Sequence, residues 1–127
     1  MSDDDDPLAG ARVLVVEDEA IVSMLIEDIL LDAGATVVGP AARVAQALAL
    51  VDQPLDAALL DVNLLGETTA PVAAALRERG VPFVFATGYG AGGLPPGFGD
   101  APVLQKPFQE HDLRAALAAL LSPAGAR

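Results

Sequence analysis

Short apolar runs alternate along this chain with stretches whose apolar residues recur at helical spacing. The apolar runs are Val13–Val16, Thr36–Val38, Ala57–Leu60, Phe83–Ala86 and Pro102–Leu104. Helical spacing covers residues 20–32, 44–51, 72–76 and 113–121. Strands buried on both faces are typically continuous apolar runs, and parallel strands need crossover helices between them. The alternation therefore predicts an α/β domain built on a doubly wound, five-stranded parallel sheet.

The stretch between the last two apolar runs, Gly88–Pro102, departs from this pattern because it is rich in glycine and proline. We expect the fourth crossover to be short, irregular or mobile rather than a regular helix. Its first residues, Gly88–Gly93, match the G-x-G-x-x-G fingerprint of dinucleotide-binding loops. That fingerprint requires a helix that opens at the loop, and the sequence Leu-Pro-Pro-Gly at Leu94–Gly97 disfavours one. We therefore do not expect a dinucleotide site.

The composition suits one domain and excludes several classes of function. The chain has 127 residues, of which 53% are hydrophobic and 20% charged, so it can bury a core without disulfides. With no cysteine and one histidine, thiolate zinc sites and a Ser-His-Asp relay are disfavoured. A net charge of −11 disfavours nucleic-acid binding, and no apolar run is long enough to span a membrane. We expect a cytoplasmic protein.

The domain boundaries are predicted from the same patterns. Residues 1–10 include the acidic run Asp3–Asp6 and are expected to form a disordered acidic tail. The folded domain is expected over residues 11–122, followed by a short C-terminal tail at 123–127.

Polar side chains follow four of the apolar runs, at the point where each predicted strand ends. They are Glu17, Asp18, Glu19, Asp61, Asn63, Thr87 and Lys106, the only lysine in the chain. Because ligands bind beyond the carboxyl ends of the strands in such sheets, we expect these side chains to converge there. Clustered carboxylates raise one another's pKa unless a cation joins them, and Mg²⁺ suits an oxygen-only site. A carboxylate can also be the nucleophile that forms an aspartyl phosphate, while lysine and threonine hold phosphoryl oxygens. The set predicts a site that handles a phosphoryl group.

Four motifs, in this order, resemble the receiver domain of two-component response regulators. They are Arg-Val-Leu-Val-Val-Glu-Asp-Glu at 12–19, Leu-Leu-Asp-Val-Asn at 59–63, Phe-Ala-Thr-Gly at 85–88 and Leu-Gln-Lys-Pro-Phe at 104–108. The resemblance covers about residues 11–122 and implies a flavodoxin-like (βα)5 fold with strand order 2-1-3-4-5. It also implies that Asp61 accepts a phosphoryl group from the phosphohistidine of a histidine kinase or histidine phosphotransferase.

The same resemblance implies a role for the other site residues. The ligands of Mg²⁺ would be Asp18, assisted by Glu17, together with Asp61 and the carbonyl of Asn63. Thr87 and Lys106 would hold the phosphoryl oxygens.

The sequence departs from the common receiver pattern in two places. Leu64–Gly66 stands where the family often has Met-Pro-Gly, and Val103 stands where it usually has an aromatic switch residue. Phe83–Gly90 is similar to a single-domain subclass called FAT-GUY receivers. This similarity implies partnership with histidine kinases of the HWE type or a related type. Tyr89 is the nearest candidate to replace the aromatic residue, and we expect the loop after Thr87 to become ordered on phosphorylation.

Three functions remain open from the sequence. Only residues 122–127 follow the last predicted helix, so we expect a phosphoacceptor that signals through another protein, as a phosphorelay intermediate, adaptor or phosphate sink. Such a chain catalyses only its own phosphorylation and dephosphorylation. One alternative is a Mg²⁺-dependent phosphohydrolase of the aspartyl-phosphate type, although Asn63 stands where that enzyme usually has its general acid–base. The other is a structural adaptor that is never phosphorylated.

Overall fold

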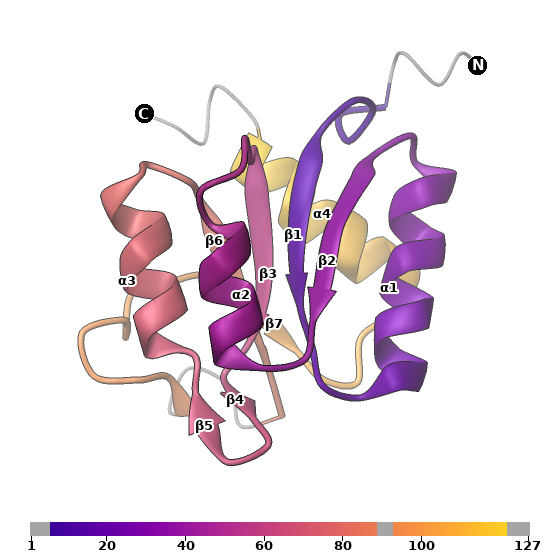
Figure 1. The fold of residues 1–127 in the computed structure, drawn as a ribbon. Helices are drawn as coiled ribbons and strands as arrows, with labels where there is room; N and C mark the ends of the chain where they lie inside the picture. Colours follow the sequence, from indigo (N-terminus) through magenta and orange to yellow (C-terminus); the bar gives the residue numbers. More distant parts are fainter. Residues whose placement is uncertain (1–5, 89–92, 122–127) are drawn as a thin grey trace.

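A five-stranded parallel sheet forms the centre of the molecule (Figure 1). The computed structural model describes residues 6–88 and 93–121. The strands of the sheet are β1 (Arg12–Val16), β2 (Thr36–Ala41), β3 (Ala57–Asp61), β6 (Phe83–Thr87) and β7 (Val103–Gln105). They lie in the order β2-β1-β3-β6-β7, and every neighbouring pair is parallel. Counted along the chain, this is the order 2-1-3-4-5, so the predicted sheet is confirmed.

Two helices cover each face of the sheet (Figure 1). Helices α1 (Ala20–Asp32) and α4 (Glu110–Leu121) pack on one face, and α2 (Val44–Leu50) and α3 (Ala70–Glu78) pack on the other. A hydrophobic core lies on each face of the sheet, and successive residues of β1 point to opposite cores. Val13 and Val15 face α1 and α4, while Leu14 and Val16 face α2 and α3. In the described part of the chain, none of these helices is long and apolar enough to cross a bilayer.

The ends of α1 and α3 follow the expected capping chemistry. Gly34 and Gly80, one residue beyond the respective C-caps, have φ values of 85° and 72°, which favour glycine. Pro71 lies in the first turn of α3, where its missing N–H leaves no helical hydrogen bond unmade.

The fourth crossover contains no regular helix in its described part. Residues 94–102 form turns, bends and irregular backbone, as their glycine and proline content predicts, so the helix that a dinucleotide fingerprint needs does not follow the loop. Phe98 anchors this segment, with its ring 6.1 Å from that of Phe83 and 5.9 Å from that of Phe85. The Arg77 guanidinium lies over the Phe98 ring at 4.4 Å. Tyr89, the predicted replacement for the aromatic switch, lies outside the described residues.

The N-terminal segment is ordered further upstream than its acidic composition suggests. Residues 6–10, predicted to belong to a disordered tail, form turns, and the Leu8 side chain is only 1% exposed. Leu8 packs into the core beneath α1 and α4, and Arg114 of α4 forms an ion pair with Asp6 at 2.9 Å. The sequence pattern missed this because the acidic run concealed a single apolar residue, Leu8, whose burial contributes about 2 kcal/mol.

A small hairpin follows β3 and was not predicted. Its strands are β4 (Asn63–Leu64) and β5 (Glu67–Thr68), which pair antiparallel. The two residues between them, Leu65 and Gly66, have φ values of 49° and 90°, the combination that a tight two-residue hairpin turn requires. The hairpin lies at the carboxyl end of the sheet (Figure 1).

Candidate functional site

The sequence-predicted residues meet at the carboxyl ends of β1, β3, β6 and β7. A pocket of about 210 Å³ lies there. Its lining residues are Asp18, Glu19, Asp61, Val62, Asn63, Ala86, Thr87, Gly88, Gly93 and Lys106. Glu17 lies outside this lining but contacts Lys106. The structure therefore brings together all seven of the side chains predicted to converge, because each lies at or just beyond the carboxyl end of a strand of one parallel sheet.

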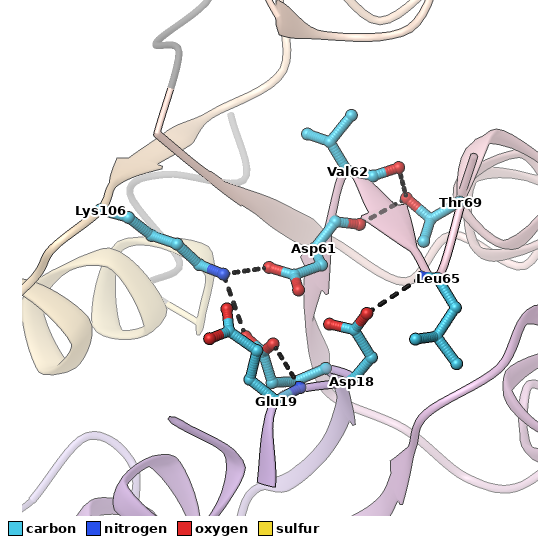
Figure 2. Close-up of polar contacts among 8 residues, drawn as sticks. Asp18, Glu19, Asp61, Val62, Leu65, Thr69 and Lys106 are labelled. Atoms are coloured by element: carbon cyan, nitrogen blue, oxygen red, sulfur yellow. Dashed lines mark hydrogen bonds and ion pairs between the residues drawn. The ribbon is translucent and has the colours of Figure 1, made fainter. Parts of the chain in front are cut away.

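Lys106 lies between two buried carboxylates (Figure 2). Its Nζ is 2.6 Å from Oδ1 of Asp61 and 3.2 Å from Oε1 of Glu17. Asp61 is 5% exposed and Glu17 is 3% exposed. Lys106 is the residue directly after β7. Its backbone N–H donates a 2.9 Å hydrogen bond to the carbonyl of Thr87. One partly exposed lysine thus pairs with two carboxylates that are almost fully buried.

The pKa values reflect this excess of negative charge. Burial and, after it, the neighbouring Glu17 raise the pKa of Asp61 from 3.8 to about 8, and Lys106 lowers it by less than Glu17 raises it. Burial lowers the pKa of Lys106, but its contacts with Asp61 and Glu17 prevail and hold it above 10.5. In the absence of a further cation, the Asp61 carboxyl therefore favours its protonated form at neutral pH.

The backbone of β2 fixes the position of Glu17. The register of β2 against β1 shifts at Gly39, which has a φ of 99°. A Cβ at this residue would lie 3.0 Å from the carbonyl oxygen of Val15, so only glycine fits. The shift brings the carbonyl of Ala41 to the N–H of Glu17, which donates to it at 3.0 Å. The Glu17 carboxylate in turn accepts a 3.0 Å hydrogen bond from the N–H of Glu19.

Asp18 is held by the hairpin (Figure 2). Its Oδ2 accepts a 2.9 Å hydrogen bond from the backbone N–H of Leu65, the residue with positive φ at the turn. A non-glycine residue in this conformation is uncommon, and such strain clusters at functional sites. Residue-type patterns do not reveal this contact, because any residue supplies a backbone N–H.

The acidic side chains form a set that fits a hard divalent cation. Glu17, Asp18 and Glu19 each place a carboxylate oxygen within 4.8 Å of the others, and Asp61 shares the pocket with Asp18 and Glu19. Every ligand atom in this set is oxygen, which Mg²⁺ prefers. The carboxylates together carry more negative charge than Lys106 alone can neutralise. Bound Mg²⁺ would offset the negative charge of Glu17, which together with burial raises the pKa of Asp61. The chain's residues therefore fit Mg²⁺.

Thr87 and Asn63 complete the pocket on its other sides. Thr87, the last residue of β6, is buried, and Asn63, the first residue of β4, is exposed. Glu19 also lines the pocket, as expected from its position after β1, although the resemblance assigned it no role. Together these groups offer a carboxylate nucleophile, a lysine, a hydroxyl and acidic oxygens, which is what transfer of a phosphoryl group to a carboxylate needs.

Comparisons with known proteins identify close structural relatives. No protein-family model and no curated protein sequence matches the chain. Among solved structures, it is similar to SdrG from Sphingomonas melonis Fr1, with 48% identity, a TM-score of 0.78 and coverage of 96% of this chain and 100% of that one. A BeF3-activated conformation of SdrG from Pseudomonas melonis Fr1 has 49% identity and a TM-score of 0.75, with coverage of 90% and 98%. The receiver domain of the PhyR response regulator of Erythrobacter litoralis has 30% identity and a TM-score of 0.77, with coverage of 89% and 91%.

Proposed function

This chain belongs to the response regulator receiver family, and from that premise we propose that it accepts a phosphoryl group on Asp61 in a Mg²⁺-dependent reaction. The observation that carries the proposal is the ion pair between Lys106 and the buried Asp61, beside the acidic cluster of Glu17, Asp18 and Glu19. A carboxylate with one lysine and an adjacent oxygen-rich cation site is arranged for attack on phosphorus rather than for structural pairing alone.

The chemistry follows from the positions of the side chains. A carboxylate oxygen of Asp61 forms a bond to phosphorus while the bond from phosphorus to the imidazole nitrogen of a phosphohistidine breaks, and the imidazole leaves with the bond's electrons. Lys106 and Thr87 stabilise the charge on the phosphoryl oxygens. Bound Mg²⁺ supplies positive charge that keeps Asp61 ionised and offsets the negative charge of the phosphoryl group. Asp18, Asp61, the carbonyl of Asn63 and, through water, Glu17 would hold it.

We propose that the donor is a histidine kinase or a histidine phosphotransferase and that the output is another protein. The support is the family membership and the net charge of −11, which disfavours a nucleic-acid partner. The FAT-GUY assignment and an HWE-type kinase are finer proposals, supported by the Phe-Ala-Thr-Gly motif at 85–88. A relative, SdrG, has a BeF3-activated conformation, and we propose that beryllofluoride activates this chain in the same way.

Incubation with Mg²⁺ and a small phosphodonor such as acetyl phosphate tests the proposal. We expect slow labelling that reaches about one phosphoryl group per chain and is absent from Asp61→Asn. Steady multiple turnover of the donor would instead support a phosphohydrolase of the aspartyl-phosphate type. Such an enzyme would then work without the usual general acid–base, because Asn63 stands at that position. No labelling with or without Mg²⁺ would favour a structural adaptor.

A further inference from the structure

Thr69 is a buried polar residue that the phosphoacceptor chemistry does not use. Its side chain is 0% exposed, and it does not line the pocket. It lies eight residues after Asp61 in the chain, at the point where the excursion through the β4–β5 hairpin returns to the start of α3. A fully buried hydroxyl needs a hydrogen-bond partner, so the identity of that partner indicates the role of the residue.

The hydroxyl of Thr69 does not cap its helix. Thr69 is the N-cap residue of α3, a position where threonine usually accepts a hydrogen bond from the first turn, yet its side chain makes no such bond. The hydroxyl instead points back to β3, where Oγ1 lies 2.5 Å from the carbonyl oxygen of Asp61 and 3.0 Å from that of Val62 (Figure 2). The backbone N–H of Thr69 also donates to the carbonyl of Val62, at 2.9 Å.

The hydroxyl has a single proton to donate, and its shorter contact is with the carbonyl of Asp61, while the backbone N–H of Thr69 holds the carbonyl of Val62. Thr69 therefore fixes two successive peptide planes at the acceptor. The carbonyl of Asp61 belongs to the peptide that joins it to Val62, and the carbonyl of Val62 belongs to the peptide that joins it to Asn63. Because each peptide is planar, holding both carbonyls leaves little freedom at the backbone between Asp61 and Asn63. The direction of the Asp61 side chain and the position of Asn63 both depend on that backbone.

The same excursion is also tied to the other acidic strand end. Its tip holds Asp18 through the N–H of Leu65, while its base holds β3 through Thr69. The segment from Val62 to Thr69 therefore connects the Asp18 carboxylate to the backbone of Asp61.

We propose that Thr69 is a positioning residue whose hydroxyl sets the Asp61 carboxylate and the Asn63 carbonyl at the geometry that binding of a divalent cation requires. The inference rests on the proposed function, since it concerns the same Mg²⁺ site. Thr69 touches neither the cation nor the phosphoryl group and acts only through the backbone of β3. Partners that orient metal ligands in this way are typically worth about 10- to 100-fold in metal affinity.

Three variants at this position separate the hydroxyl from the rest of the side chain. Thr69→Val removes the hydroxyl and keeps the branched shape, Thr69→Ser keeps the hydroxyl and removes the methyl group, and Thr69→Ala removes both. We expect Mg²⁺ affinity, measured by calorimetric titration, to fall about tenfold in the Val and Ala variants and to stay within about twofold of wild type in the Ser variant. If the Val variant does not fold, the Ala and Ser variants still make the comparison.

A matched control excludes a general effect of lower stability. Leu117→Ala creates a cavity in the core beneath α4 and should destabilise the protein at least as much as Thr69→Val, without changing Mg²⁺ affinity. Wild-type affinity in Thr69→Val and Thr69→Ala, an equal loss in Thr69→Ser, or an equal loss in Leu117→Ala would overturn the inference.

A metal-free measurement distinguishes failure of this inference from failure of the proposed function. The backbone amide resonances of Val62 and Asn63 should move in Thr69→Val and remain near their wild-type positions in Thr69→Ser. If they do not move in Thr69→Val, the positioning role is wrong whether or not the wild type is phosphorylated. If wild type binds Mg²⁺ but takes no phosphoryl group, the proposed function fails while the amide shifts still decide the role of Thr69.

Discussion

Replacing Asp61 by asparagine should stabilise the metal-free protein at neutral pH. The pKa of Asp61 is raised from 3.8 to about 8, first by burial and then by Glu17. A carboxyl that binds its proton more tightly in the folded chain contributes stability that is full below pH 3.8 and lost as the pH rises through about 8. Asparagine has nearly the same shape and stays neutral throughout, so the variant does not suffer this loss.

The size of the effect follows from the same values. Between pH 4 and pH 7 the linkage amounts to about 1.4 kcal/mol for each pH unit, or about 4 kcal/mol at most. The pocket opens to solvent, which screens the charge, and we therefore expect about half of this, ~2 kcal/mol at pH 7. A difference of ~2 kcal/mol is large beside the total stability of an ordinary domain, about 5–15 kcal/mol.

Urea unfolding with a chelator present, repeated from pH 4 to pH 9, measures the prediction. The free energy of unfolding of Asp61→Asn should rise above that of wild type as the pH increases, with little difference near pH 4. Addition of Mg²⁺ should then raise the stability of wild type more than that of the variant, because the cation removes the excess of negative charge. Parallel curves for the two proteins across this range would refute the reasoning, as would a variant that is less stable at pH 8.

Three further predictions concern the neighbouring residues. Asp18→Asn removes an anionic oxygen ligand and should weaken Mg²⁺ binding; unchanged affinity in a calorimetric titration would count against Asp18 as a ligand. Lys106→Ala leaves the phosphoryl oxygens without their cation and should slow labelling of Asp61 by acetyl phosphate about 100-fold, and a rate near that of wild type would remove Lys106 from the mechanism. Phe98→Ala should lower the free energy of unfolding by about 3 kcal/mol, since it takes one ring out of the cluster with Phe83 and Phe85; a loss below ~1 kcal/mol by urea unfolding would show that the loop is not anchored there.

The central sheet could be predicted from the sequence because its three middle strands, β1, β3 and β6, are almost fully buried. Buried parallel strands give uninterrupted apolar runs, and the helices between them give a helical period, so the type of each element could be inferred. The order of the strands within the sheet came from the resemblance to receiver domains. The site followed from the sheet: once Glu17, Asp61 and Lys106 are known to lie at the carboxyl ends of strands of one parallel sheet, their meeting is a matter of topology.

The contacts that orient the site could not be predicted in the same way. Leu65 holds Asp18 through its backbone N–H, which carries no signal of residue type. Thr69 looks in sequence like an ordinary helix cap before a proline, and its use of the hydroxyl toward β3 depends on the hairpin between them. The hairpin itself has strands of two residues each, too short for an alternating pattern.

Leu8 has a practical consequence for where this domain is taken to begin. The sequence patterns place the start of the domain at residue 11, but Leu8, which precedes the first strand, is buried in the core beneath α1 and α4. A protease cut or truncation after Gly10 would expose that core and forfeit about 2 kcal/mol, the worth of burying one leucine. A fusion partner or affinity tag joined directly at Ala11 would carry the same penalty even though every strand, helix and site residue remained. The functional boundary of a small domain is therefore set by its outermost buried side chain rather than by its first strand.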